Sequence, residues 1–205
     1  MINPKDENNI KPPLEALADF LTEVWILLRA DLNKSPQICY DCGLSATNDF
    51  NKAQAAYVES VEDKEYNLIL ISPVFATADW NYYGETVKKA VHELYHAYQV
   101  QILGRTLNCD IIDFKAGEAK PEYFTDKNEI EAHAFDEWFE QYWLKITTEN
   151  EHIPAMPDCD LLPKYRFEKE YRRFESKYGP GMMRNSKKWD LLTIELLRSL
   201  KLLKK

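Results

Sequence analysis

Two of the four histidines in the chain lie close together, in the segment His92-Glu93-Leu94-Tyr95-His96. On a helix, residues at positions i and i+4 lie on the same face, one above the other. Two imidazoles placed in this way can hold one Zn²⁺, and the glutamate after the first can act as a general base on a water that the metal activates. The segment therefore has to be helical, and it predicts a zinc-dependent hydrolase, provided that the chain supplies a third ligand.

The helix that carries this motif is predicted to run from about Gly84 to Leu103, because apolar residues recur there with helical periodicity. These residues form one stripe that would anchor the helix to a core: Val87, Val91, Leu94 and Tyr98. His92 and His96 lie on a different side of the helix, so we expect both imidazoles to face a cleft. Gly104 is a suitable stop for this helix, because glycine readily adopts the left-handed conformation that ends many helices.

Four further helices and one β-hairpin are predicted around the motif helix. The hairpin comprises residues 56–61 and 66–72, whereas residues 36–51 and 105–125 are expected to be largely irregular. The helices are expected at residues 12–28 and 126–146 and, after a proline-containing linker, at residues 167–178 and 189–203. This pattern predicts an α+β fold, mainly helical, with a small antiparallel sheet beside the motif helix. We expect residues 1–150 to form the domain and residues 151–205 to form a helical extension packed on it.

The third ligand has to come from outside the motif. The extended pattern H-E-x-x-H-x-x-G-x-x-H is excluded, because Gln99 and Ile102 stand where it needs glycine and histidine. The next predicted helix offers three other candidates, Glu129, Glu131 and His133.

Helix phase distinguishes these three candidates. Glu131 lies on the same side of its helix as the apolar Phe135, so this side is expected to face inward. A carboxylate on an inward face is unfavourable unless it is paired or bound to a metal. Glu129 and His133 point the other way, and Glu129 also has the spacing of a capping residue relative to Asp126. We therefore expect Glu131 to be the third ligand and His133 to lie at the surface.

The charge of the chain is unevenly distributed. The net charge is −8, but residues 164–205 carry 13 Lys+Arg and 5 Asp+Glu, so the remaining 163 residues have a net charge of −16. We expect the basic segment to dock on the acidic body, which argues against a nucleic-acid partner. The polar N-terminus lacks the apolar run that is typical of a signal peptide, and the most apolar stretch, Phe20–Leu28, is too short to span a bilayer. A cytoplasmic protein without a membrane partner is the expectation.

The four cysteines do not form a recognisable metal-binding framework. Cys39 and Cys42 make one C-x-x-C pair, whereas Cys109 and Cys159 lie far from it and from each other. A structural zinc site would need a second close pair, and disulfides are rare without secretion. Buried or incidental thiols are therefore the preferred interpretation.

The order of a hairpin, an H-E-x-x-H helix and a second helix with Glu131-Ala132 resembles the catalytic core of gluzincin metallopeptidases. More narrowly, His92-Glu93-Leu94-x-His96 followed by Glu129-x-Glu131-Ala132-x-x-Phe135 is similar to the small intracellular ImmA/IrrE-like peptidases, over residues 55–145. Tyr95 stands where that family often has glycine, and Trp138-Phe139-Glu140-Gln141 replaces its Leu-Leu-Met-Pro run. The SprT-like peptidases match less well, because a further histidine ligand and a C-terminal cysteine quartet are missing.

This resemblance implies a zincin-like domain and a zinc metallopeptidase that acts on a peptide or protein substrate. Its expected zinc ligands are His92, His96 and Glu131, and Glu93 is the expected general base. An alternative is a zincin-fold interaction or regulatory protein without catalysis, for example from a mobile element. The intact Glu93 favours the enzyme, because zinc binding alone does not require this residue.

A peptidase also needs a hydrogen-bond donor for the anionic oxygen that develops on the scissile carbonyl. Three tyrosines are candidates, Tyr95, Tyr98 and Tyr123, and the sequence does not decide among them. Tyr98 is disfavoured, because it belongs to the apolar stripe.

Overall fold

The computed structural model describes residues 11–41, 55–61, 64–73, 75, 80–107, 112–113, 118–119, 122–147, 163–178 and 187–199. The N-terminal half contains α1 (Pro13–Leu27), η2 (Leu32–Lys34), β1 (Gln37–Tyr40), β2 (Ala55–Val61), β3 (Lys64–Ile71) and α2 (Trp80–Gln101). The C-terminal half contains β4 (Ile112–Asp113), β5 (Glu118–Ala119), η5 (Tyr123–Thr125), α3 (Lys127–Thr147), α4 (Lys164–Tyr178) and α6 (Lys187–Ser199). The described chain is thus mainly helical with a small sheet, which confirms the α+β class.

The three-stranded sheet has the order β1-β3-β2 and is mixed. β2 and β3 form the expected antiparallel hairpin, but β1 pairs in parallel with β3, with Ile38 opposite Ile69. The prediction of a purely antiparallel sheet is therefore wrong, as is that of irregular structure at residues 37–40. β3 is the central strand, and burial alternates along its apolar run: Ile69 and Ile71 are buried in the core, whereas Leu68 and Leu70 on the other face are half-buried.

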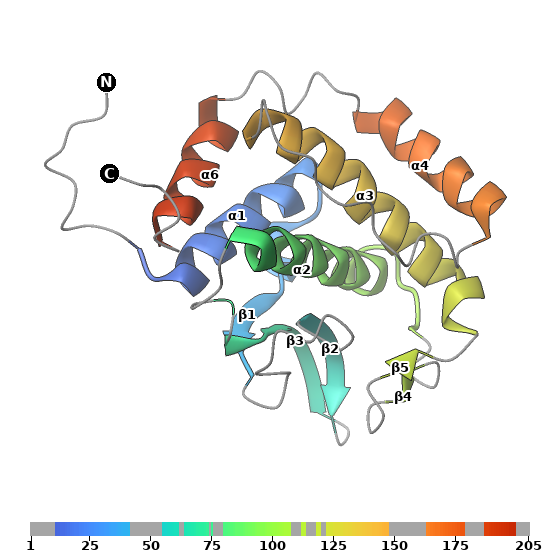
Figure 1. Cartoon of the computed structure of the whole chain (residues 1–205). Coiled ribbons are helices and arrows are strands. Elements are labelled where there is room, and N and C mark those ends of the chain that lie inside the picture. Colours follow the sequence, from blue (N-terminus) through green and yellow to red (C-terminus); the bar gives the residue numbers. More distant parts are fainter. Residues whose placement is uncertain are drawn as a thin grey trace, which may run out of the picture.

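Helix α2 occupies the centre of the molecule, with the sheet on one side and α1 and α3 on the other (Figure 1). Its stripe residues Val87, Val91 and Leu94 are buried in the core, as expected. Tyr98 is half-buried and packs edge-on against Trp25 of α1. Gly104, with φ of 63°, follows the end of the helix and confirms the predicted stop.

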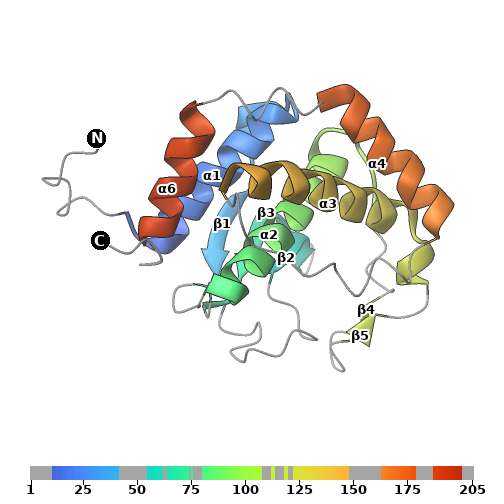
Figure 2. The same cartoon turned by 45° about the horizontal axis from the view of Figure 1, so that its top comes forward.

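Helix α3 is covered on two sides, by α2 and by α4 (Figure 2). Every residue from 129 to 136 is buried, including two glutamates, a histidine and an aspartate. The helix begins at a cap, because Asp126 Oδ1 accepts hydrogen bonds from the backbone N–H groups of Asn128 and Glu129. This double coverage means that α3 has two inward faces.

The C-terminal helices share the hydrophobic core with the rest of the molecule. Phe174 and Tyr178 of α4 pack on α3, and Trp189 of α6 contacts Phe20 of α1 edge-on. Cys39 in β1 has a free thiol, and the other three cysteines lie outside the described residues. Among the described helices, none combines the length and apolar character needed to cross a membrane.

Candidate metal centre

Three ligand-type atoms converge where α2 faces α3. The Nε2 atoms of His92 and His96 lie 3.0 Å apart, and Glu129 Oε2 lies 3.3 Å from each of them. All three residues are buried: Glu129, the most exposed of them, is only 7% exposed. We call His92, His96 and Glu129, which could together hold a metal ion, the metal centre.

The dimensions of the metal centre fit a zinc ion. With bonds of about 2.0–2.1 Å, two ligands of a tetrahedral zinc ion lie about 3.3–3.4 Å apart. The three observed separations are 3.0, 3.3 and 3.3 Å, so an ion can lie at about these bond lengths from all three atoms with only small adjustments. Two imidazoles and one carboxylate are also the ligand set of several catalytic zinc sites, which leave a fourth position open.

Two further side chains fix which nitrogen of each histidine is free. Asp136 Oδ2 lies 2.9 Å from His92 Nδ1, and Gln99 Oε1 lies 2.8 Å from His96 Nδ1. Both oxygens are acceptors, so each Nδ1 carries a proton, and in the neutral form of each ring Nε2 presents its lone pair to the metal centre. Gln99 is itself oriented, because its Nε2 donates to the backbone carbonyl of Asn128 at 3.0 Å. Two lone pairs facing each other at this distance repel unless a cation lies between them.

The electrostatics of the site favour positive charge at this point. Burial lowers the pKa of His92, but hydrogen bonds with Asp136 and Glu129 outweigh it and raise the pKa to about 10. Burial raises the pKa of Glu129, but the charge of His96 and hydrogen bonds from both histidines hold it far below the usual range of a carboxyl. A metal ion satisfies the same demand as the proton that it replaces.

Glu93 lies beside the metal centre, half-buried between α2 and the sheet. Its Oε2 accepts a hydrogen bond of 2.7 Å from the backbone N–H of Tyr57, in β2. Burial raises the pKa of Glu93, against the lowering effect of His96 and His92. The sheet thus holds one carboxylate oxygen, and a carboxylate has a second oxygen that can accept a proton.

Glu131 lies elsewhere, although it is as deeply buried as the sequence predicted. Its Oε2 accepts hydrogen bonds from Arg105 at 2.9 Å, from Arg173 at 3.4 Å and from the hydroxyl of Tyr95 at 3.5 Å. The structure therefore brings Glu129, and not Glu131, to the two histidines. The prediction from helix phase assumed that α3 has a single inward face. The helix has two inward faces, and Glu131 lies on the one toward α4.

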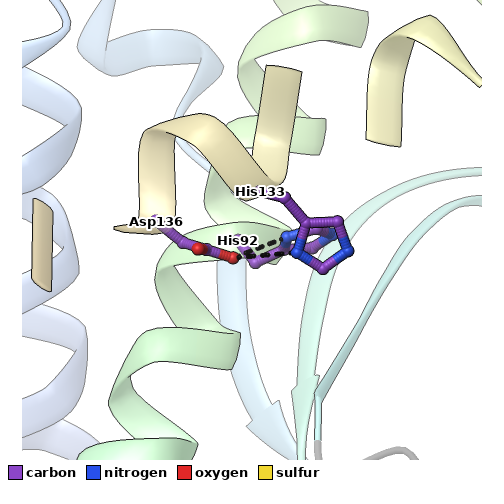
Figure 3. A group of neighbouring side chains, drawn as sticks. All are labelled: His92, His133 and Asp136. Atoms are coloured by element: carbon purple, nitrogen blue, oxygen red, sulfur yellow. Dashed lines mark hydrogen bonds and ion pairs between the residues drawn. The ribbon is translucent and has the colours of Figure 1, made fainter. Parts of the chain in front are cut away.

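The face of α3 toward α2 carries two further residues that the sequence analysis did not assign to the site. Figure 3 shows the carboxylate of Asp136 facing the rings of both His92 and His133 from one side, with contacts to both. His133, expected at the surface, is only 8% exposed. The spacing of Glu129, His133 and Asp136, at i, i+4 and i+7, was the available signal, because it places all three on one helix face. His92, His133 and Asp136 also have the residue types of a metal site, but Asp136 here orients a ligand of the metal centre.

The polar contact between α2 and α3 continues beyond the histidines. Lys88, one turn before His92, is buried and pairs with Glu137 at 2.7 Å and with Glu140. Burial lowers the pKa of Lys88, but the charges of Asp136, Glu140 and Glu137 outweigh it and raise the pKa well above the usual range of a lysine. Lys88 therefore stays charged and balances the carboxylates of α3.

The three tyrosines that the sequence left open lie in different places. Tyr95 donates to Glu131 and Tyr98 packs on Trp25, whereas the hydroxyl of Tyr123 lies 3.0 Å from Nε2 of His133. Burial, together with the charges of Glu129 and Glu93, raises the pKa of Tyr123 well above that of a free phenol. Of the three, Tyr123 is the one that these contacts place beside the metal centre.

A scan against protein-family models found no match, and searches of curated proteins and of solved structures found none either. The interpretation of the site therefore depends on its own geometry and chemistry.

Proposed function

We propose that the chain is a zinc-dependent metallopeptidase with a gluzincin-like site in a zincin-like fold. His92, His96 and Glu129 are the zinc ligands of this proposal, and Glu93 is the general base. The observation that carries it is the arrangement of three buried ligand atoms at 3.0–3.3 Å from one another. Each histidine has its other nitrogen held by an acceptor, as metal-binding histidines usually do.

The protein's own contributions to peptide hydrolysis follow from these contacts. Bound zinc would polarise the scissile carbonyl and make a nearby water more acidic. Glu93 takes the proton of the attacking water and passes it to the leaving amine. The hydrogen bond from Tyr57 restricts the carboxylate of Glu93, so that little reorganisation is needed when it acts. Asp136 and Gln99 keep the two imidazoles in the tautomer that binds metal.

The position of the sheet supports a peptide as the substrate. β2 is an outer strand of the three-stranded sheet and lies against α2, which carries Glu93 and two of the ligands. An outer strand offers backbone groups with which an extended peptide can pair. The substrate of this proposal is therefore an extended segment of a peptide or protein.

One observation favours a second candidate function, a zinc-binding interaction protein without catalysis. The hydrogen bond from Tyr57 N–H gives Glu93 a structural role, because it ties α2 to β2. A protein that needs only this tie would retain Glu93 without using it as a base. Glutamine could also accept this hydrogen bond but could not take a proton from water, so Glu93→Gln distinguishes the two functions.

The test uses the full chain loaded with zinc and a mixture of internally quenched peptides. The peptidase proposal expects cleavage that a chelator abolishes and that added zinc restores. Glu93→Gln should keep the zinc and lose the cleavage, whereas Glu15→Gln, a matched change at an exposed site on α1, should retain both. Zinc binding without cleavage of any peptide would favour the interaction protein.

A further inference from the structure

A chain of polar contacts runs from the metal centre to Tyr123. Asp136 Oδ2 lies 2.9 Å from Nδ1 of His92 and 3.5 Å from Nδ1 of His133. At the other edge of its ring, Nε2 of His133 lies 3.0 Å from the hydroxyl of Tyr123. One carboxylate oxygen thus faces both a metal ligand and the histidine that holds the tyrosine (Figure 3).

The charge of Asp136 determines the tautomer of His133. A lone pair on Nδ1 would face the carboxylate and be repelled, so Nδ1 carries the proton. Nε2 is then the acceptor, and the hydroxyl of Tyr123 donates to it. His133 therefore holds the hydroxyl of Tyr123 in a defined direction when no substrate is present.

This hydroxyl lies next to the place where the reaction would occur. The rings of His92 and His133 lie against each other, with centroids 4.4 Å apart. Tyr123 belongs to η5, directly before α3, and its hydroxyl is close enough to Glu129 to interact with this ligand as well. Tyr95 cannot serve in this way, because its hydroxyl is held by Glu131 and Arg173 on the far side of α3.

We propose that Tyr123 donates a hydrogen bond to the anionic oxygen that develops on the scissile carbonyl, and that His133 is the residue that positions it. This inference rests on the proposed peptidase function. The O–H bond of Tyr123 does not break; its hydrogen turns from His133 Nε2 to the new oxygen. Hydrogen bonds to charged acceptors are about twice as strong as neutral ones, so the developing anion outcompetes the imidazole.

The first test compares Tyr123→Phe with Tyr171→Phe on the zinc-loaded full chain. Tyr171 is the matched control, because its hydroxyl donates to Gln141 on the outside of α3 and α4, away from the site. Loss of an oxyanion donor lowers kcat by about 10²-fold with little change in KM, because the bond exists only in the transition state. Equal kcat values in the two variants would overturn the proposal.

The positioning role of His133 has its own test. His133→Ala should lower kcat by less than Tyr123→Phe does, and His133→Gln should recover part of the loss, because its amide oxygen can replace Nε2 as acceptor. The double variant Tyr123→Phe/His133→Ala should be no slower than Tyr123→Phe, because His133 acts through the hydroxyl. Additive losses at equal zinc content would contradict this role.

A binding measurement separates this inference from the proposed function. The visible spectrum of the cobalt-loaded protein reports the binding of acetohydroxamate, which presents an anionic oxygen at the metal. Tyr123→Phe should bind acetohydroxamate about 10-fold or more weakly than the native chain, and Tyr171→Phe should bind it equally well. Equal affinity in all three would sink the inference. Weaker binding in Tyr123→Phe without any peptide cleavage by the native chain would instead sink the peptidase proposal and leave the donor role of Tyr123 intact.

Discussion

Two glutamates of α3, Glu129 and Glu131, should differ in what their replacement changes. Replacing Glu129 should weaken zinc binding, whereas replacing Glu131 should lower the free energy of unfolding. Structural zinc sites with four ligands bind with about 10–16 kcal/mol, so each ligand contributes roughly 2.5–4 kcal/mol. Glu129→Gln keeps the shape of the side chain but removes an anionic ligand 3.3 Å from both histidines. We therefore expect the Kd for zinc to rise by at least about 10²-fold.

Glu131→Gln should leave zinc binding unchanged and reduce stability instead. Its carboxylate is 1% exposed and faces Arg105 and Arg173, which would lose their buried partner. Breaking a buried ion pair typically costs about 3–5 kcal/mol. The arginine side chains are 25% and 46% exposed, so they can recover water, and we expect a loss of about 2–3 kcal/mol.

Two measurements on each variant test this pair of expectations. Competition with a chromophoric zinc chelator gives the Kd, and urea unfolding of the zinc-free protein gives the free energy of unfolding. The ligand assignment would be refuted if Glu131→Gln folded but did not bind zinc while Glu129→Gln still bound it. Glu131 would then be the third ligand.

Three further predictions concern the surroundings of the site. Asp136→Asn should weaken zinc binding by about 10–100-fold without abolishing it, as measured by the same competition, because it leaves His92 without its charged acceptor. Lys88→Met should lower the free energy of unfolding by about 3–5 kcal/mol at pH 7.5, because it leaves the carboxylates of α3 without their cation. That loss should shrink at pH 5 in urea unfolding. Burial raises the pKa of Glu140 to about 7 against the lowering effect of Lys88, so without Lys88 the Glu140 carboxyl takes up a proton in the folded variant at a higher pH than in the unfolded chain, and this uptake stabilises the folded variant as the pH falls. Gly104→Ala should cost about 1 kcal/mol with unchanged zinc affinity, because φ is 63° although no atom lies within 4 Å of the added carbon.

Local periodicity was sufficient to predict much of the fold. The hairpin, the motif helix with its buried Val87, Val91 and Leu94, and the cap at Asp126 depend on interactions between near neighbours in the sequence. β1 depends on a parallel partner many residues away, and its short sequence, Gln37–Tyr40, has no pattern that indicates this pairing. The periodicity of a short segment does not predict such non-local contacts.

The sequence was sufficient to predict the two histidines of the metal centre but not its carboxylate. His92 and His96 share one helix, so their spacing fixes their geometry. The choice between Glu129 and Glu131 depends on which side of α3 faces α2, and α4 covers the other side. Arg173, which pairs with Glu131, comes from α4, whose position the sequence does not reveal. The apolar residues of α3 therefore correctly predicted a buried face of this helix, but it is the face toward α4 and not the face beside the histidines.

The most direct test of the central claim is the rate of peptide cleavage by the native chain and by Glu93→Gln, each carrying one equivalent of zinc. The two proteins have the same ligands and differ in the general base alone. The proposed mechanism predicts cleavage by the native chain and a rate lower by about 10²–10⁴-fold in the variant. Equal rates at equal zinc content would contradict it.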